Sequence, residues 1–245
     1  MTVELRGRVA LVTGAGRRVG RALALALGRR GATVAVHQAH SPDDAASAVR
    51  EIEALGAKAA PFQADLTLPG AAEALVEAVV AKFGGLHHLV NSAAIMERTP
   101  FGETTIDAWD RIFALNLRAP FLLSQAAAPH LRKTGGTIVN IADLAAYETW
   151  PGYIPHGLTK SGLVHLTRSL ARILAPAVRV NAIAPGTVLL PDDWRREDEE
   201  RLNRTTPLAR QGSPDDVAAA MLFLIDSEYI TGETIIVDGG RHVRA

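Results

Sequence analysis

The fold of this 245-residue chain is decided by the stretch Thr13-Gly14-Ala15-Gly16-Arg17-Arg18-Val19-Gly20. A short β-branched run at 9–13 leads into it, and an Ala- and Leu-rich run at 18–30 leaves it. A strand that enters a helix through a glycine-rich turn brings backbone close to a phosphate group, and the N–H groups and positive dipole end of the helix face that group. The stretch therefore predicts a βα unit with a dinucleotide site.

The rest of the chain repeats the same alternation of short β-branched runs and longer helical runs. The pattern predicts strands at 9–13, 33–37, 57–63, 88–91, 137–141, 178–182 and 234–237. It predicts helices at 18–30, 42–55, 70–83, 106–132, 157–175 and 214–226. No Pro/Gly/Ser-rich linker divides the chain. We therefore expect one α/β domain over 1–245, a Rossmann-type, doubly wound parallel sheet with helices on both faces.

Composition argues against several classes of function. The 26 basic and 26 acidic residues leave no net charge, which disfavours nucleic acid or an anionic membrane as the main partner. The absence of Cys excludes disulfides and thiolate metal sites, and no other metal site is expected from the spacing of the histidines. Because neither a signal peptide nor a membrane-spanning run is apparent, a soluble cytoplasmic protein is expected.

Three further segments carry local predictions. Ser41-Pro42-Asp43-Asp44 and Ser213-Pro214-Asp215-Asp216 each predict a helix start with a serine cap, proline at the first position and acids in the first turn. The charged stretch 192–204 is interpreted as a solvated surface helix, and its position also allows a mobile cover over a site.

The end of the second predicted strand favours NADP(H) over NAD. An acid there would bind the ribose hydroxyls and repel a 2′-phosphate. The strand ends Val36-His37-Gln38-Ala39-His40-Ser41, with no acid before Asp43. Arg17 or Arg18, in the preceding turn, is expected to pair with the phosphate, and His40 and Ser41 to add contacts.

Several motifs together resemble the short-chain dehydrogenase/reductase family, over the whole chain. They are Thr13 to Gly20, Asp65, Asn91-Ser92-Ala93-Ala94, Asn116, Lys160, Asn181-Ala182-Ile183-Ala184-Pro185-Gly186, and the ending from Tyr229-Ile230-Thr231-Gly232 to Val237-Asp238-Gly239-Gly240. The resemblance places Asp65 near the adenine, Asn91 beside the adenine ribose and Lys160 on the nicotinamide ribose. It places Pro185 and Gly186 at the nicotinamide, and makes Asn116 the holder of a water in the proton relay. The complete expected cofactor set is Gly14, Arg17, Arg18, Val19, Gly20, His37, His40, Ser41, Asp65, Leu66, Asn91, Ser92, Ala93, Lys160, Pro185, Gly186 and Val188.

Within that family the chain is most similar to the pteridine reductase branch, which is NADP-dependent. Arg18 stands where the middle glycine of the fingerprint usually lies, and Asp143 stands where the family carries a catalytic Ser. The stretch from His37 to Ser41 also resembles that branch. Met96 departs from it, because the branch carries there an aromatic residue that stacks on the pterin. Ser92 likewise replaces the second Asn of the common motif.

The main departure from the family is His156, which stands thirteen residues after Asp143 and four before Lys160, where the family carries a Tyr. The spacing of four places His156 and Lys160 on one face of a helix. An imidazole ordinarily titrates near 6.5, whereas a phenol titrates near 10. Lys160 and an oxidised nicotinamide would disfavour the imidazolium form, and Asp143 would favour it.

Three interpretations of this substitution stay open. In the first, His156 donates the proton in the reduction of a carbonyl or imine, with Asn116, Asp143 and Lys160 as the other catalytic residues. In the second, the chain keeps the cofactor but is catalytically idle or regulatory. In the third, the hydroxyl of Tyr153 or Tyr147 replaces the missing phenol.

The substrate is expected to be a small molecule, apolar or flat, such as a pteridine-like, ketone or oxoacyl compound. The predicted loops 92–103, 143–156 and 187–210 contain several apolar residues, and Met96, Tyr153 and Trp194 are the expected contacts. The family resemblance implies a homotetramer or homodimer, built through the helices predicted at 106–132 and 157–175 and the C-terminal segment.

Overall fold

The computed structural model describes residues 5–189 and 196–243. Its strands are β1 (Val9–Val12), β2 (Thr33–Gln38), β3 (Ala59–Gln63), β4 (His88–Asn91), β5 (Thr137–Ile141), β6 (Arg179–Pro185) and β7 (Thr234–Val237). Its α-helices are α1 (Arg18–Arg29), α2 (Pro42–Ala54), α3 (Ala71–Phe83), α4 (Ile106–Phe113), α5 (Ala119–Thr134), α6 (Ile154–Leu174), α7 (Arg196–Thr205) and α8 (Pro214–Asp226). A π-helical segment η1 (Ala114–Arg118) joins α4 to α5, and short 3₁₀ turns lie at η2 (Leu144–Ala146) and η3 (Arg241–Val243).

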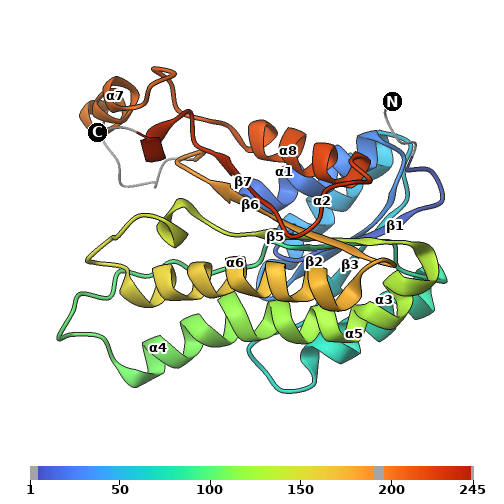
Figure 1. Cartoon of the computed structure of the whole chain (residues 1–245). Coiled ribbons are helices and arrows are strands. Elements are labelled where there is room, and N and C mark those ends of the chain that lie inside the picture. Colours follow the sequence, from blue (N-terminus) through green and yellow to red (C-terminus); the bar gives the residue numbers. More distant parts are fainter. Residues whose placement is uncertain (1–4, 190–195, 244–245) are drawn as a thin grey trace.

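All seven strands form one parallel sheet in the order β3-β2-β1-β4-β5-β6-β7 (Figure 1). The direction of winding reverses between β1 and β4, which are neighbours in the sheet but far apart in the sequence. In a sheet of this kind, ligands bind in the crevice at the carboxyl ends of the strands beside the reversal. The predicted doubly wound α/β fold is confirmed.

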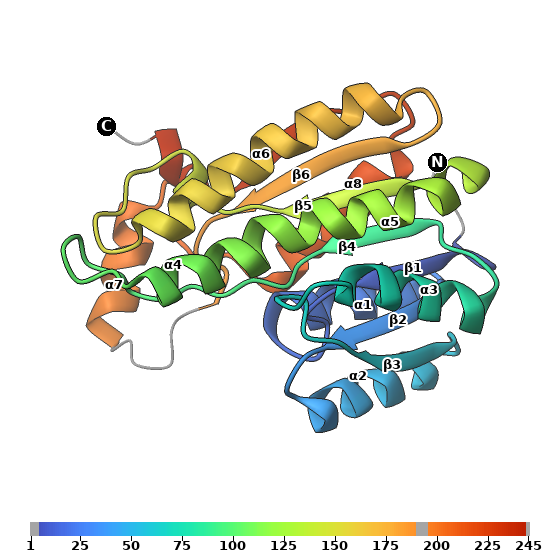
Figure 2. The ribbon, with the colours of Figure 1, turned by 90° about the horizontal axis from the view of Figure 1, so that it is seen from below.

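Helices cover both faces of the sheet, as Figures 1 and 2 show from two directions. Helices α1, α2 and α8 lie on one face, and α3, α5 and α6 lie on the other. Each face has its own apolar core, because the central strands β1, β4 and β5 are buried on both sides. The cores fix the sheet rigidly and leave the loops at its carboxyl edge to form a site.

The predicted helix at 106–132 is wrong as a single α-helix. The chain instead runs through α4, the π-helical segment η1 and α5. Pro120 explains the irregularity, because it has no N–H to give to the carbonyl of Asn116, four residues before it. The ladder shifts by one residue, with the N–H of Ala119 bonded to the carbonyl of Ala114. Such π segments commonly mark functional positions, and Asn116 lies within this one.

Only one of the two predicted serine caps forms. The Ser213 hydroxyl accepts the N–H of Asp216, and the Asp216 carboxylate accepts the N–H of Ser213, which completes a capping box at α8. Ser41 makes no such side-chain bond, so its predicted cap is wrong. Its N–H is held by the side chain of Gln38 at 2.7 Å, and the hydroxyl lies toward Gly16 instead.

The remaining boundaries differ by a few residues. Helix α6 begins at Ile154 rather than at 157, so that His156 lies in its first turn. Strand β6 extends to Pro185, beyond the predicted end at 182. The described part of the charged stretch forms α7, whose only buried side chain among those described is Leu202. Over the ranges described, no helix combines the length and the apolar character that crossing a bilayer requires.

Candidate active site

The glycine turn after β1 is held in place by a hydrogen bond to the side chain of His37. The ring Nδ1 of His37 accepts the N–H of Gly14 at 3.1 Å, and the ring Nε2 donates to the carbonyl of Ala64 at 3.0 Å. Burial lowers the pKa of His37, with the bond to Ala64 opposing, so the ring stays neutral. The prediction that His37 contacts the cofactor directly is wrong for its side chain, because both nitrogens are used and the ring is 2% exposed.

The turn itself has the shape and the free donors that a pyrophosphate needs. A Cβ at Gly20 would collide with the carbonyl of Gly14, and one at Gly14 would lie 3.0 Å from the Cα of Ala93. Helix α1 then begins with no side-chain cap and no acid in its first turn. Its first N–H groups and its positive dipole end therefore have no protein anion to satisfy them, which fits a bound phosphate.

Thr13 joins the two strands at the reversal point. Its hydroxyl accepts the N–H of Ser92 at 2.9 Å and the N–H of Ala93 at 3.0 Å. The loop after β4 is thereby tied to the glycine turn, with the predicted residues Ser92 and Ala93 at the junction. The motif predicted a turn at Thr13 but no such role for its hydroxyl.

The four predicted phosphate contacts come from the glycine turn and from the end of β2, and Arg17 connects the turn to the start of α2. Arg17 pairs with Asp44, its Nε 3.1 Å from Oδ2, although both side chains are partly exposed. Arg18 is exposed and has a φ of 51°, a left-handed conformation that a non-glycine residue adopts at a cost of about 1–2 kcal/mol. His40 is exposed and Ser41 half-buried. Arg17 and Arg18 bring two positive charges, and Asp44 offsets part of the charge of Arg17.

Asp65 lies close to this group and is ionised. The hydroxyl and the N–H of Thr67 both donate to its Oδ1, at 2.6 and 2.9 Å. The nearby His40 makes a smaller contribution to the pKa of Asp65, in the same direction as these bonds. These bonds lower the pKa of Asp65. One carboxylate oxygen remains outside these bonds. Leu66, the next residue, is buried beneath the loop.

Asn91 points into the protein and not toward the crevice. Its amide nitrogen donates to Asn140 at 2.8 Å, and Asn140 in turn donates to Thr167 at 2.9 Å. The prediction that Asn91 lies beside the adenine ribose is therefore wrong for its side chain, and only its main chain remains available. The buried polar chain ties β4 and β5 to α6, a tertiary contact that the sequence motif does not reveal.

Three of the four predicted catalytic side chains meet at the start of α6. The Nε2 of His156 lies 3.7 Å from Oδ2 of Asp143, too long for a hydrogen bond. His156 is 2% exposed, and its Nε2 is buried without a hydrogen-bond partner. Lys160 donates to the carbonyl of Ile141 at 2.9 Å. Burial lowers the pKa of Lys160, and the charge of Asp143 opposes the effect.

The fourth, Asn116, reaches the same place from η1. Its amide lies 3.4 Å from Nδ1 of His156 and also binds both backbone atoms of Ile95. The side chain is 1% exposed and its amide is engaged by protein atoms. A relay water at Asn116, as predicted, would therefore bind its main-chain carbonyl, which lacks its helical donor because of Pro120.

The loop after β6, where the sequence predicts the nicotinamide, is held by the C-terminal segment. The N–H of Gly186 donates to the carbonyl of Val237, and a Cβ at Gly186 would lie 2.7 Å from that of Asp238. Arg241 donates to the hydroxyl of Thr187 at 3.1 Å. Pro185 ends β6 and Val188 is buried, so the predicted loop from 185 to 188 is rigidly placed.

The predicted substrate contacts are only partly placed. Met96 is half exposed, and Tyr153 lies at the start of α6, where its ring packs edge-on against Trp150. A bridge between Thr99 and Tyr153 joins their two loops into one wall. Trp194 lies outside the described residues. Tyr147 is nearly half exposed.

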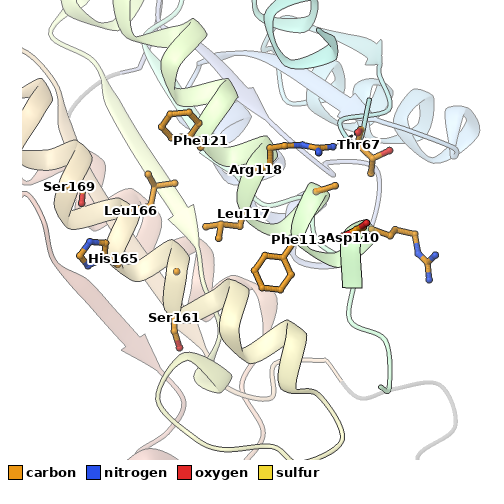
Figure 3. A pocket seen from close by; sticks show the side chains of 13 residues that line it. Thr67, Asp110, Phe113, Leu117, Arg118, Phe121, Ser161, His165, Leu166 and Ser169 are labelled. Carbon is orange, nitrogen blue, oxygen red and sulfur yellow. Dashed lines mark hydrogen bonds between the residues drawn. The ribbon is translucent and has the colours of Figure 1, made fainter. Parts of the chain in front are cut away.

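The described chain carries one notable surface feature outside this crevice and no metal-ligand cluster. Among residues 5–189 and 196–243, no group of three or more metal-ligating side chains comes together. An open hollow of about 1260 Å³ lies on the outer side of η1, α5 and α6 (Figure 3). Its apolar lining includes Phe113, Leu117, Phe121 and Leu166, and it does not include the catalytic side chains.

Comparison with known proteins agrees with the fold and identifies the family. The family model described as enoyl-(acyl carrier protein) reductase matches residues 14–242. An uncharacterised oxidoreductase of Methylorubrum extorquens is 39% identical, over 97% of this chain and 98% of its own length. The 3-oxoacyl-[acyl-carrier-protein] reductase of Staphylococcus aureus is 37% identical, over 96% and 98% respectively. The crystal structure of a dehydrogenase/reductase from Sinorhizobium meliloti superposes with a TM-score of 0.92 at 34% identity, covering 98% of this chain and 97% of that one.

Proposed function

The chain belongs to the short-chain dehydrogenase/reductase family, and we propose on that premise that it is an NADP(H)-dependent reductase of a carbonyl or imine group. We propose further that His156 takes the proton-donating role for which the family uses a Tyr. The observation that carries this proposal is the buried Nε2 of His156, which has no hydrogen-bond partner and lies 3.7 Å from Asp143. A buried polar atom left without a partner is costly, and such atoms are retained where a ligand or a reaction uses them.

The geometry fits the cofactor at both ends. The uncapped start of α1 would hold the pyrophosphate, and Lys160 has N–H groups beyond the one given to Ile141 for the nicotinamide ribose. The 2′-phosphate of NADP would lie near Arg18, His40 and Ser41. The strained φ of Arg18 supports that assignment, because strain of this kind persists where function requires it.

The bound nicotinamide would supply the hydride, and the residues of this chain would supply the proton. The Nε2 of His156 gives its proton to the oxygen or nitrogen of the group being reduced. Asp143 stabilises the charged imidazolium before transfer, and Lys160 stabilises the negative charge that develops on the accepting oxygen or nitrogen until the proton reaches it. The apolar surroundings of Met96 and Tyr153 would bind a flat or apolar substrate, with pteridine-like, ketone and oxoacyl compounds as the candidates.

The test compares native protein with His156→Ala and His156→Tyr. We expect NADPH oxidation, measured with a panel of ketones, quinones, oxoacyl thioesters and pterins, to fall about 10²–10⁴-fold in His156→Ala. NADPH binding, followed by its fluorescence, should change little in either variant.

Two results would contradict the proposal. Unchanged turnover in His156→Ala would remove His156 from the reaction and leave Tyr153 or Tyr147 to be tested in the same way. Binding of NADPH without turnover of any substrate, together with activity restored by His156→Tyr, would favour a chain that binds the cofactor and is idle or regulatory.

We also propose that the chain is a homodimer or homotetramer that uses the hollow on η1, α5 and α6 (Figure 3). Phe121 and Leu117 would be left facing water in a monomer, and an apolar surface of that kind is typical of an interface. Family members are commonly oligomeric, and this surface corresponds to the long helices from which the sequence predicts assembly.

A further inference from the structure

The two ring nitrogens of His156 have different surroundings. Nδ1 lies 3.2 Å from the main-chain carbonyl of Ile95. Nε2 faces Asp143 at 3.7 Å and has no hydrogen-bond partner. These neighbours therefore determine which of the two ring nitrogens of His156 exchanges its proton.

The side-chain amide of Asn116 makes hydrogen bonds with both the N–H and the carbonyl of Ile95. The N–H of Ile95 donates to Oδ1 of Asn116 at 2.9 Å, and Nδ2 of Asn116 donates to the carbonyl of Ile95 at 2.9 Å. An N–H can only donate and a carbonyl can only accept, so the orientation of this amide is determined. Asn116 thereby holds the Ile95 carbonyl in place beside the ring.

The second hydrogen of that amide has a partner other than His156. The hydroxyl of Thr159 donates to the carbonyl of His156 at 2.7 Å, which leaves its lone pairs free to accept from Nδ2 of Asn116 at 3.3 Å. The contact from Nδ2 to Nδ1 of His156 is longer, at 3.4 Å. Nδ1 therefore has no need to act as an acceptor, whereas the Ile95 carbonyl beside it can only accept.

We infer that the Ile95 carbonyl, positioned by Asn116, keeps a proton on Nδ1 of His156, so that the ring takes up and releases its reactive proton only at Nε2. In the charged ring, both N–H groups then face acceptors, Ile95 on one side and Asp143 on the other. Asn116 is a positioning residue in this arrangement, and Ile95 acts through its main chain. That the proton at Nε2 takes part in a reaction rests on the proposed function, whereas the assignment of a proton to Nδ1 does not.

The test is the ring protonation of His156, observed by NMR on unliganded protein labelled with ¹⁵N at its histidines. The chain has eight histidines, and the resonances lost in His156→Gln identify the one of interest. At a pH of about 9, where imidazoles are ordinarily neutral, we expect Nδ1 to be protonated and Nε2 unprotonated. The opposite pattern in the native protein would overturn the inference.

Two variants test the positioning by Asn116. In Asn116→Leu the two hydrogen bonds that position the Ile95 backbone are lost, so the His156 ring should shift toward the form protonated at Nε2. Turnover should fall about tenfold to a hundredfold while the NADPH dissociation constant stays nearly the same. Thr159→Val is the matched control, because it removes a bond to the same amide without touching Ile95, and it should keep the native pattern.

An unchanged protonation pattern of the His156 ring in Asn116→Leu would show that Asn116 does not determine it. If that variant does not fold, Asn116→Ser provides the same comparison, and the native spectrum still decides the Nδ1 assignment. The outcomes are distinguishable from failure of the proposed function: unaffected turnover in His156→Ala refutes the chemistry, and it leaves the ring protonation pattern where the spectra place it.

Discussion

The ring of His37 and the backbone of Gly14 are joined by a hydrogen bond of 3.1 Å that supports the glycine turn from within the protein. With the second ring nitrogen bonded to Ala64, the side chain connects the ends of β1, β2 and β3. The cofactor turn therefore depends on a residue that has no contact with the crevice itself.

Replacement of this brace should weaken cofactor binding. In His37→Gln the bond to Gly14 or the bond to Ala64 is lost, and a buried group without a partner costs about 1–3 kcal/mol. We expect the NADPH dissociation constant, measured by fluorescence titration, to rise about tenfold. His130→Gln, on α5, is the control and should bind normally; equal affinities for the two variants would rule out a bracing role.

Three neutral histidines should make the protein sensitive to acid. Burial lowers the pKa of His88 to about 3, helped by positive neighbours, and burial also lowers the pKa of His37 and of His87. The unfolded chain takes up protons on these rings at a higher pH than the folded chain does, so the free energy of unfolding falls as the pH drops below about 6.5. Each such ring contributes up to about 1.4 kcal/mol per pH unit.

The measurement is urea unfolding at about pH 7.5 and about pH 5.5. We expect a clear loss of stability at the lower pH, and a smaller loss in His88→Asn, which keeps a partner for Thr137 but cannot be protonated. A pH dependence that is the same in both proteins would show that His88 is protonated in the folded state.

Arg18 is expected to lower the free energy of unfolding and to raise the preference for NADPH over NADH. Arg18→Gly relieves the left-handed strain, and after the entropy cost of glycine we expect a gain of about 1 kcal/mol in the free energy of unfolding. The same change removes a cation from the proposed 2′-phosphate site, so the preference for NADPH over NADH should fall about tenfold. Thermal unfolding and the ratio of the two dissociation constants provide the measurements.

The matched comparison is Arg17→Ala, which removes a cation already paired with Asp44 and leaves the strained position unchanged. It should give no gain in stability and a smaller loss of preference. A preference that is unchanged in Arg18→Gly would separate the strain at this position from cofactor recognition.

A charge on the apolar hollow should prevent assembly. Phe121→Glu places a carboxylate where a second copy would otherwise bury the ring, so we expect a protomer-sized species by light scattering after gel filtration. Leu55→Glu, at the end of α2, is an equally exposed apolar position away from this surface and should assemble as the native chain does. Native-size assemblies from both variants would exclude the hollow as an interface.

The sequence predicted the architecture well because the alternation of strands and helices is local. It also predicted the glycine turn and the capping box at Ser213, where the residue types themselves make the bonds. It failed where a side chain could turn either way, as with His37 and Asn91, since a motif gives position and not direction. Ile95 could not be found at all, because its backbone makes the contact and any residue type has one.

The hydrogen bond from Arg241 to Thr187 has a practical consequence for anyone preparing this protein. The last described residues contact the loop at the end of β6, and Asp238 holds them there through bonds to Gly240 and His242. An affinity tag or a fusion partner attached directly after this segment would begin beside the loop at the end of β6. Purification handles therefore belong at the amino end, which enters the sheet on the side away from the crevice.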